Sequence, residues 1–119
     1  SDWSSDVCSS DLRTGIYNIQ FSAQLLNFST AEDNVTIWLR VDGSDIPMSA
    51  GVVEVLPKHG SNPGAVISTW NYVDTYTAGS YFELYWHAGG NAVVGTYPPA
   101  TSPTRPGSPS LILTVTQVA

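Results

Sequence analysis

Hydrophobic and polar residues alternate along much of the chain. In GIYNIQFSAQLLNF, residues 15–28, every second residue from Tyr17 to Leu25 is apolar, and most of the residues between them are polar. The stretch NVTIWLRV, residues 34–41, repeats the pattern with Trp38 and Arg40 on the outward side. A side-chain period of two is typical of a strand with one buried face. We therefore predict strands over both stretches.

Several later stretches predict further strands, and turn residues separate them. Asp42-Gly43 is a typical hairpin dipeptide, and PPATSPTRPGS, residues 98–108, is an internal loop with four prolines. No stretch indicates a helix. The further predicted strands cover residues 52–56, 65–73, 80–88, 92–97 and 110–118.

This succession of strands predicts an all-β fold, an antiparallel sandwich of two sheets. The inward set of each strand supplies the expected core. These core residues are Tyr17, Ile19, Phe21, Leu25, Val35, Ile37, Leu39, Phe82, Leu84, Trp86, Leu111, Leu113 and Val115.

Residues 1–12, SDWSSDVCSSDL, do not fit this pattern. They show neither helical nor strand periodicity, and they lack the apolar run of a signal peptide. Asp2 to Leu12 can be encoded by a DNA string that resembles a common short-read sequencing adapter. We therefore expect residues 1–12 to be an artefactual, irregular segment that contributes nothing to the fold. The remaining residues, 13–119, are expected to form one domain that lacks its first strand.

The charge balance excludes some partners. The formal net charge is −6, and residues 1–12 carry three of the ten acids and the single cysteine, Cys8. Without them, seven acids and four bases remain, a charge near −3. Such a surface offers no footprint for nucleic acid or for an anionic membrane. No apolar run approaches the roughly 20 residues of a membrane-spanning helix.

Catalytic and metal-binding patterns are weak. His59 and His87 have no second ligand at a metal-binding spacing, and no nucleophile motif is present. The acids of Asp42-Gly43-Ser44-Asp45 fit a hairpin turn better than a calcium loop. The sequence favours a protein that is not an enzyme and uses no metal or cofactor.

The outward aromatic residues are the best candidates for a functional surface. Three explanations remain open: a contact between subunits, a loop that covers the rings, or a platform for a ligand. The candidate residues are Trp38, Arg40, Tyr81, Tyr85 and His87.

Four motifs in order support a resemblance: G-I-Y-x-I-x-F from Gly15, N-V-T-I-W-L-R-V-D-G from Asn34, A-G-S-Y-F-E-L from Ala78 and S-L-I-L-T-V from Ser110. Together they resemble the jelly roll of the complement-head and tumour-necrosis-factor-like type. TWNYV, ELYW and TSPTRPGSPSLILTVTQV resemble more closely the jelly-roll domains of tailed-phage virion proteins.

The resemblance implies a non-enzymatic virion module, on a tail fibre or capsid surface, that forms a homotrimer and displays loops toward other virion proteins or the host surface. The alternative is a secreted bacterial domain that binds carbohydrate through aromatic rings. The first reading places the protein on the virion surface and the second outside a bacterial cell.

Overall fold

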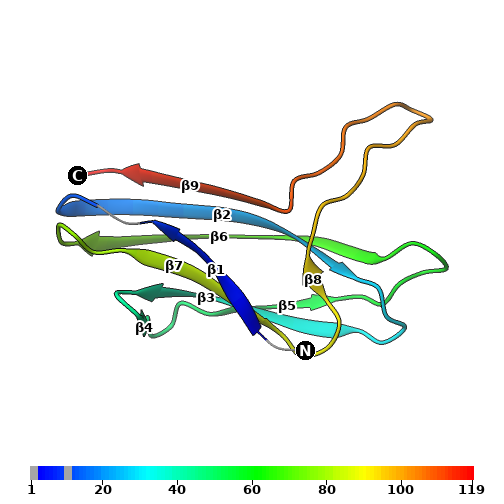
Figure 1. Cartoon of the computed structure of the whole chain (residues 1–119), viewed down its shortest axis with the longest axis horizontal. Coiled ribbons are helices and arrows are strands. Elements are labelled where there is room, and N and C mark those ends of the chain that lie inside the picture. The colour runs from blue at the N-terminus through cyan, green and yellow to red at the C-terminus, as the bar shows by residue number, and fades with distance from the viewer. Residues whose placement is uncertain (1–2, 10–11) are drawn as a thin grey trace.

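The protein is a two-layer antiparallel β-sandwich, as the alternation predicts (Figure 1). The computed structural model describes the backbone of residues 3–9 and the whole of residues 12–119. The strands are β1 (Trp3–Ser9), β2 (Gly15–Asn27), β3 (Asp33–Val41), β4 (Ser44–Asp45), β5 (Gly51–Val55), β6 (Gly64–Tyr76), β7 (Phe82–Ala88), β8 (Val93–Val94) and β9 (Leu111–Gln117).

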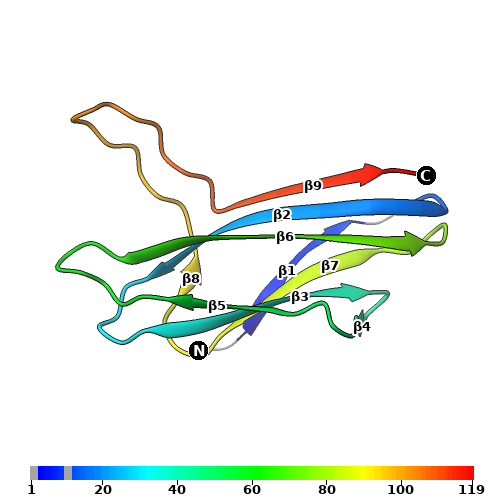
Figure 2. The same ribbon diagram turned by 180° about the vertical axis from the view of Figure 1, so that it is seen from behind.

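Each layer is built around one central strand. In the first, which we call the β7 sheet, β7 lies between β1 and β3, and the far edge of β3 pairs with β4 and β5. In the second, the β2 sheet, β2 pairs with β6 along one edge and with β8 and β9 along the other. Viewed from both sides, β5 and β6 run next to each other at one margin of the sandwich (Figures 1 and 2).

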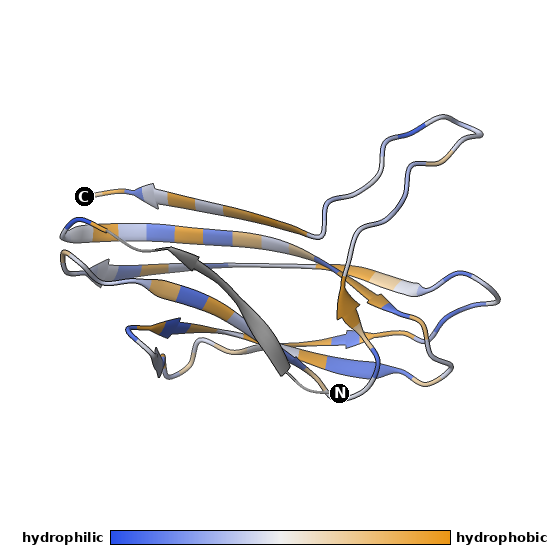
Figure 3. Cartoon of the chain, viewed as in Figure 1, coloured by the Kyte–Doolittle hydropathy of each residue, from blue (hydrophilic) through white to orange (hydrophobic). Residues whose placement is uncertain are grey.

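The core lies between the two sheets, where the inward residues of both meet. The ribbon coloured by hydropathy shows the alternation along β2 and β7 (Figure 3). Nine of the thirteen predicted core residues are buried, and Phe82, Ile19 and Leu25 are fully enclosed. Burial alternates because the side chains of a strand point to opposite faces in turn.

Four predicted core residues are only half-buried: Trp86, Leu111, Leu113 and Val115. The last three belong to β9, an edge strand that pairs with β2 alone among the described strands. An edge strand has a neighbour on one side only, so its inward side chains are covered less completely. Trp86 stands opposite Ser4 of β1 in the ladder.

The expectation of irregular structure for residues 1–12 is wrong for Trp3–Ser9, which form β1 and pair with β7. The free edge of β7 offers backbone donors and acceptors that an extended segment of any sequence can satisfy. The register of β1 against β7 is irregular, because it shifts between Ser4 and Val7.

Leu12 also departs from that expectation. It is buried in the core with Tyr17 and Phe82, and its carbonyl accepts a hydrogen bond from Gly79 N at 3.0 Å. The side chains of residues 1–11, including Trp3 and Cys8, lie outside the described part of the chain. So does the backbone of residues 1–2 and 10–11.

The proline-rich loop is an arm that projects from the sandwich between β8 and β9 (Figure 1). Its two limbs are joined by backbone hydrogen bonds between Tyr97 and Ser108 and between Ala100 and Arg105. The strand predicted over 92–97 is shorter than expected, because only Val93–Val94 pair with β2 before the chain leaves for the arm.

Candidate functional site

Four of the five candidate residues meet on the outer face of the β7 sheet. Trp38 and Arg40 lie on β3, with Tyr85 and His87 on the adjacent β7, and the register pairs Trp38 directly with Tyr85. The intervening residues of both strands face the core. The alternation therefore predicts correctly which side chains share this surface. With Asp45, the four line a shallow cavity of about 170 Å³.

The rings and the guanidinium group of this cluster pack against one another. The ring centroids of Trp38 and Tyr85 are 5.8 Å apart, with their planes inclined by 37°. The guanidinium carbon of Arg40 lies 4.7 Å from the centroid of Tyr85, a cation–π arrangement. Each of these three side chains is half-buried, whereas His87 is exposed. No loop of residues 12–119 covers them completely.

Asp45 joins the cluster, although its sequence position indicated only a turn. Trp38 Nε1 donates a hydrogen bond to Asp45 Oδ1 at 2.8 Å, and Arg40 Nε lies 3.1 Å from the same oxygen. Arg40 also donates to the carbonyl of Gly43. These contacts hold the indole and the guanidinium group in fixed orientations. The sequence does contain a signal for this contact: a two-residue hairpin turn at Asp42-Gly43 places Asp45 opposite Arg40.

Tyr81 is the candidate residue that lies apart. It precedes β7, and its backbone nitrogen donates to Asp42 Oδ1 at 3.1 Å. Ser80 Oγ donates to the other oxygen of the same carboxylate at 3.2 Å. Asp42 therefore ties the β3–β4 turn to the segment before β7. The two aspartates of the hairpin therefore bind different partners: Asp42 accepts hydrogen bonds from Ser80 and Tyr81, and Asp45 contacts Trp38 and Arg40.

A second surface, on the outer face of the β2 sheet, differs in kind. Among the described residues of β2, β6 and β9, none on this face carries a charge. Most of them are Asn, Gln, Ser or Thr, with apolar side chains between them. A shallow groove of about 610 Å³ runs over it and includes Trp70, Thr114 and Ile112 in its lining. We call this the uncharged face.

The margin between β5 and β6 adjoins the uncharged face. A cavity of about 280 Å³ opens there between the sheets, lined in part by Val52, Val53 and Trp70. Trp70 lines both hollows, so the two surfaces are continuous. Several apolar side chains here are strongly exposed: Val52 69 %, Val73 60 %, Ile67 59 %, Trp70 53 % and Ile112 53 %.

Two tyrosines of β6, Tyr72 and Tyr76, have raised pKa values. Burial raises the pKa of Tyr72 to about 12, and burial with a smaller contribution from Asp74 raises the pKa of Tyr76 to about 12. The hydroxyl of Tyr72 donates to Ser49 O at 2.9 Å. The hydroxyl of Tyr76 is buried without a hydrogen-bond partner among the described residues. Both are parts of the core.

Metal-ligating side chains do not gather in the part of the chain that the structure describes. His59 lies in the loop between β5 and β6, where its backbone exchanges hydrogen bonds with Asn62. No helix of the described residues is long and apolar enough to cross a membrane.

The chain matches no model of a known protein family, and no curated protein is significantly similar to it. The class of protein that the fold defines is an antiparallel β-sandwich with one aromatic and one uncharged outer face.

Proposed function

We propose that the protein is a non-enzymatic structural and attachment module of a virion, on a tail fibre or capsid surface, and that it works as a homotrimer. The observation that carries this proposal is the uncharged face together with the apolar margin beside it. The resemblance to complement-head and phage jelly-roll domains supports both the virion setting and a trimer as the oligomeric state.

The uncharged face suits contact with protein better than contact with water. Soluble monomers rarely expose continuous apolar patches of several hundred Å², and the cores of subunit interfaces are poor in charge. Among the described residues, the outer face of the β2 sheet carries no charge, and exposed apolar side chains such as Ile67, Val73 and Ile112 lie on it. A subunit 49 Å long and 32 Å wide provides room for the roughly 800 Å² per partner that a stable interface requires.

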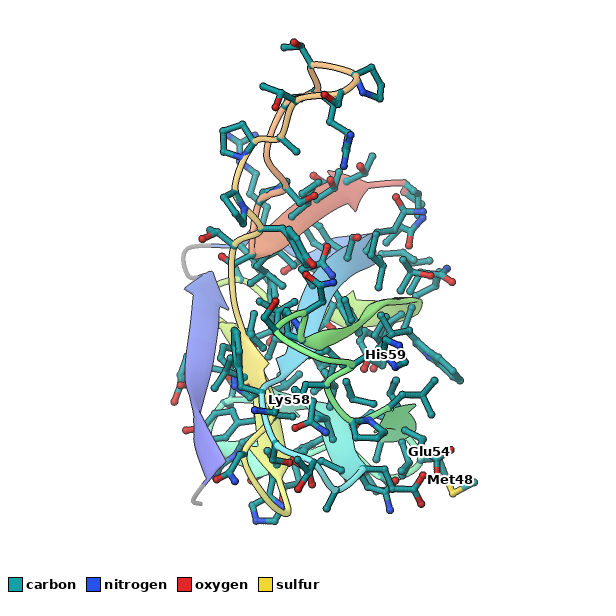
Figure 4. All side chains as sticks on the ribbon, turned by 90° about the vertical axis from the view of Figure 1, so that its right-hand side faces the viewer. Met48, Glu54, Lys58 and His59 are labelled. Atoms are coloured by element: carbon teal, nitrogen blue, oxygen red, sulfur yellow. The ribbon has the colours of Figure 1, made fainter. Side chains whose placement is uncertain are left out.

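The uncharged face and the apolar margin beside it differ in shape, which favours a head-to-tail arrangement. One is a sheet face with a shallow groove, and the other is a margin from which large side chains project. Met48 and Glu54 project at the margin of the β7 sheet, whereas Lys58 and His59 belong to the neighbouring loop (Figure 4). When the margin of one subunit packs on the uncharged face of the next, the contact is heterologous, and a rotation of one third of a turn closes it into a ring.

The experiment is to place a charge on the uncharged face and measure the molar mass in solution. Ile112→Lys puts an ammonium group in the groove at a position where the wild-type side chain is half-exposed, so the fold tolerates it. Light scattering coupled to gel filtration should give a trimer for the wild type and a monomer for this variant.

The matched control is Phe28→Lys, which places the same charge on an exposed apolar residue of the loop after β2 that lines neither hollow. It should remain a trimer. A wild type that stays monomeric at high concentration overturns the proposal. A trimer that survives Ile112→Lys and Trp70→Glu together overturns the location of the interface.

A further inference from the structure

We propose that the outer face of β3 and β7 binds a saccharide, with the rings of Trp38 and Tyr85 as the platform for a pyranose. The proposal concerns the opposite sheet from the uncharged face, so it goes beyond trimer formation and does not depend on it. The proposed trimer joins the uncharged face of one subunit to the β5–β6 margin of the next, and the cavity beside Trp38 and Tyr85 shares no lining residue with either hollow.

The rings supply the apolar half of the site. A pyranose presents a patch of C–H groups on one side of its ring, and the face of an aromatic ring carries the negative part of its quadrupole, which attracts such groups. Trp38 and Tyr85 lie 5.8 Å apart and inclined by 37°, so together they form a shallow, V-shaped wall. The cavity of about 170 Å³ against this wall is small and open, which suits one sugar ring better than an extended peptide.

Polar groups at the rim supply the other half. Asp45 is two-thirds exposed at its side chain, and its Oδ2 accepts no hydrogen bond from the described residues. The exposed imidazole of His87 lines the same cavity. A carboxylate oxygen and an imidazole beside an aromatic wall can each bond a sugar hydroxyl while the ring stacks.

The platform is already ordered before any ligand arrives. Asp45 fixes the indole through the 2.8 Å bond to Nε1, and Arg40 rests on Tyr85. Binding therefore does not have to freeze these side chains, which reduces its entropic cost.

A subunit contact explains this surface less well. The cluster carries an arginine, an aspartate and a histidine within one small cavity, with Glu83 opposite Arg40 in the ladder. Interface cores are depleted of such charges. The uncharged face is the better surface for a subunit, and this leaves the charged aromatic surface for a polar ligand.

The test is a titration of the ¹⁵N-labelled full chain with methyl β-D-galactopyranoside and methyl β-D-glucopyranoside, followed by NMR. Sorbitol, an open-chain polyol with hydroxyl groups but no ring face, is the ligand control. At least one glycoside should shift the amide signals of β3 and β7 and the Nε1 signal of Trp38, with millimolar affinity, while sorbitol should not.

Variants locate the binding. Trp38→Ala should weaken it about tenfold or more, whereas Tyr85→Phe keeps the ring and should change it less than about threefold. Asp45→Asn should weaken it while the indole bond is kept, because an amide oxygen still accepts from Nε1. Trp70→Ala removes an exposed indole from the other sheet and should leave the affinity per chain unchanged, even if it alters the oligomer.

Three results would overturn the inference: no shift with either glycoside, equal shifts with sorbitol, or shifts that centre on Trp70. Signals of β3 and β7 that change with protein concentration alone would also overturn it and would assign the surface to a subunit contact. Because Tyr85→Phe and Asp45→Asn are nearly isosteric, they keep the test decisive if Trp38→Ala does not fold.

Discussion

Asn27 is the buried polar residue whose removal should be most costly. Its side chain is 0 % exposed and uses its full hydrogen-bonding capacity. Nδ2 donates to Ala31 O at 2.8 Å and to Val55 O at 3.2 Å. Oδ1 accepts from Ser29 N at 3.0 Å and from Ser29 Oγ at 2.9 Å. One amide thus joins the end of β2, the following loop and the end of β5.

Asn27→Ala should lower the free energy of unfolding by about 2–4 kcal/mol. A net 0.5–1.5 kcal/mol for each of about four hydrogen bonds gives an upper range. The single hydroxyl hydrogen of Ser29 lies within reach of both Asn27 Oδ1 and Ala31 O, so in the variant it is donated to Ala31 O, which recovers part of the loss. Urea unfolding followed by tryptophan fluorescence measures the change, provided that the denaturant slope stays constant.

Two further variants sharpen this prediction. Asn27→Asp has the same shape, but its carboxylate cannot donate to the two carbonyl groups. Its pKa in the folded state should therefore rise above the usual value of about 3.9. The free energy of unfolding of this variant should therefore be highest below about pH 3.9, the pKa in the unfolded state, and should fall as the pH rises through the higher pKa of the folded state. Asn34→Ala, at an exposed asparagine of β3 in the facing sheet, should cost less than about 0.5 kcal/mol. A loss of under 1 kcal/mol for Asn27→Ala would refute the reasoning.

The remaining predictions concern the core tyrosines and the first strand. Because burial raises the pKa of Tyr72 and Tyr76 from 10.0 to about 12, the stability they provide is complete below pH 10 and is lost as the pH rises toward 12. Tyr76→Phe should reduce this alkaline loss in pH-dependent unfolding and cost little at pH 7, since the hydroxyl has no partner among the described residues. Deleting residues 1–11 should lower the unfolding free energy by more than about 1 kcal/mol, against the sequence-based expectation, because it strips the edge of β7.

The sequence predicts the fold best where a strand has one buried and one exposed face. In β2, β3 and β7 the period of two identifies both the core residues and the outward Trp38, Arg40, Tyr85 and His87. Register follows from the same alternation, because a slip by one residue would turn Phe21 or Leu84 outward. For β2, β3 and β7, the alternation therefore predicts both which residues are buried and which face outward.

Edges and corners could not be predicted in this way. β1 pairs through its backbone, which leaves no trace in a pattern of side chains. The half-burial of Leu111 and Val115 depends on which strand neighbours β9, and that is a property of the whole sandwich. Asp45 joins the aromatic cluster because a tight turn folds it back on Arg40. Local composition indicates only the turn, and Asp45 is placed opposite Arg40 only when the turn is taken as a two-residue hairpin.

The arm between β8 and β9 gives the protein a place where its sequence can change at little cost. The hydrogen bonds between Tyr97 and Ser108 hold the base of the arm closed, so the two strands keep their spacing whatever lies beyond Ala100 and Arg105. Residues 101–104 are exposed, and added residues there would lengthen the tip without entering the core. An inserted peptide tag at this tip should be tolerated and accessible to an antibody, which makes the arm a natural point for engineering or for evolutionary diversification.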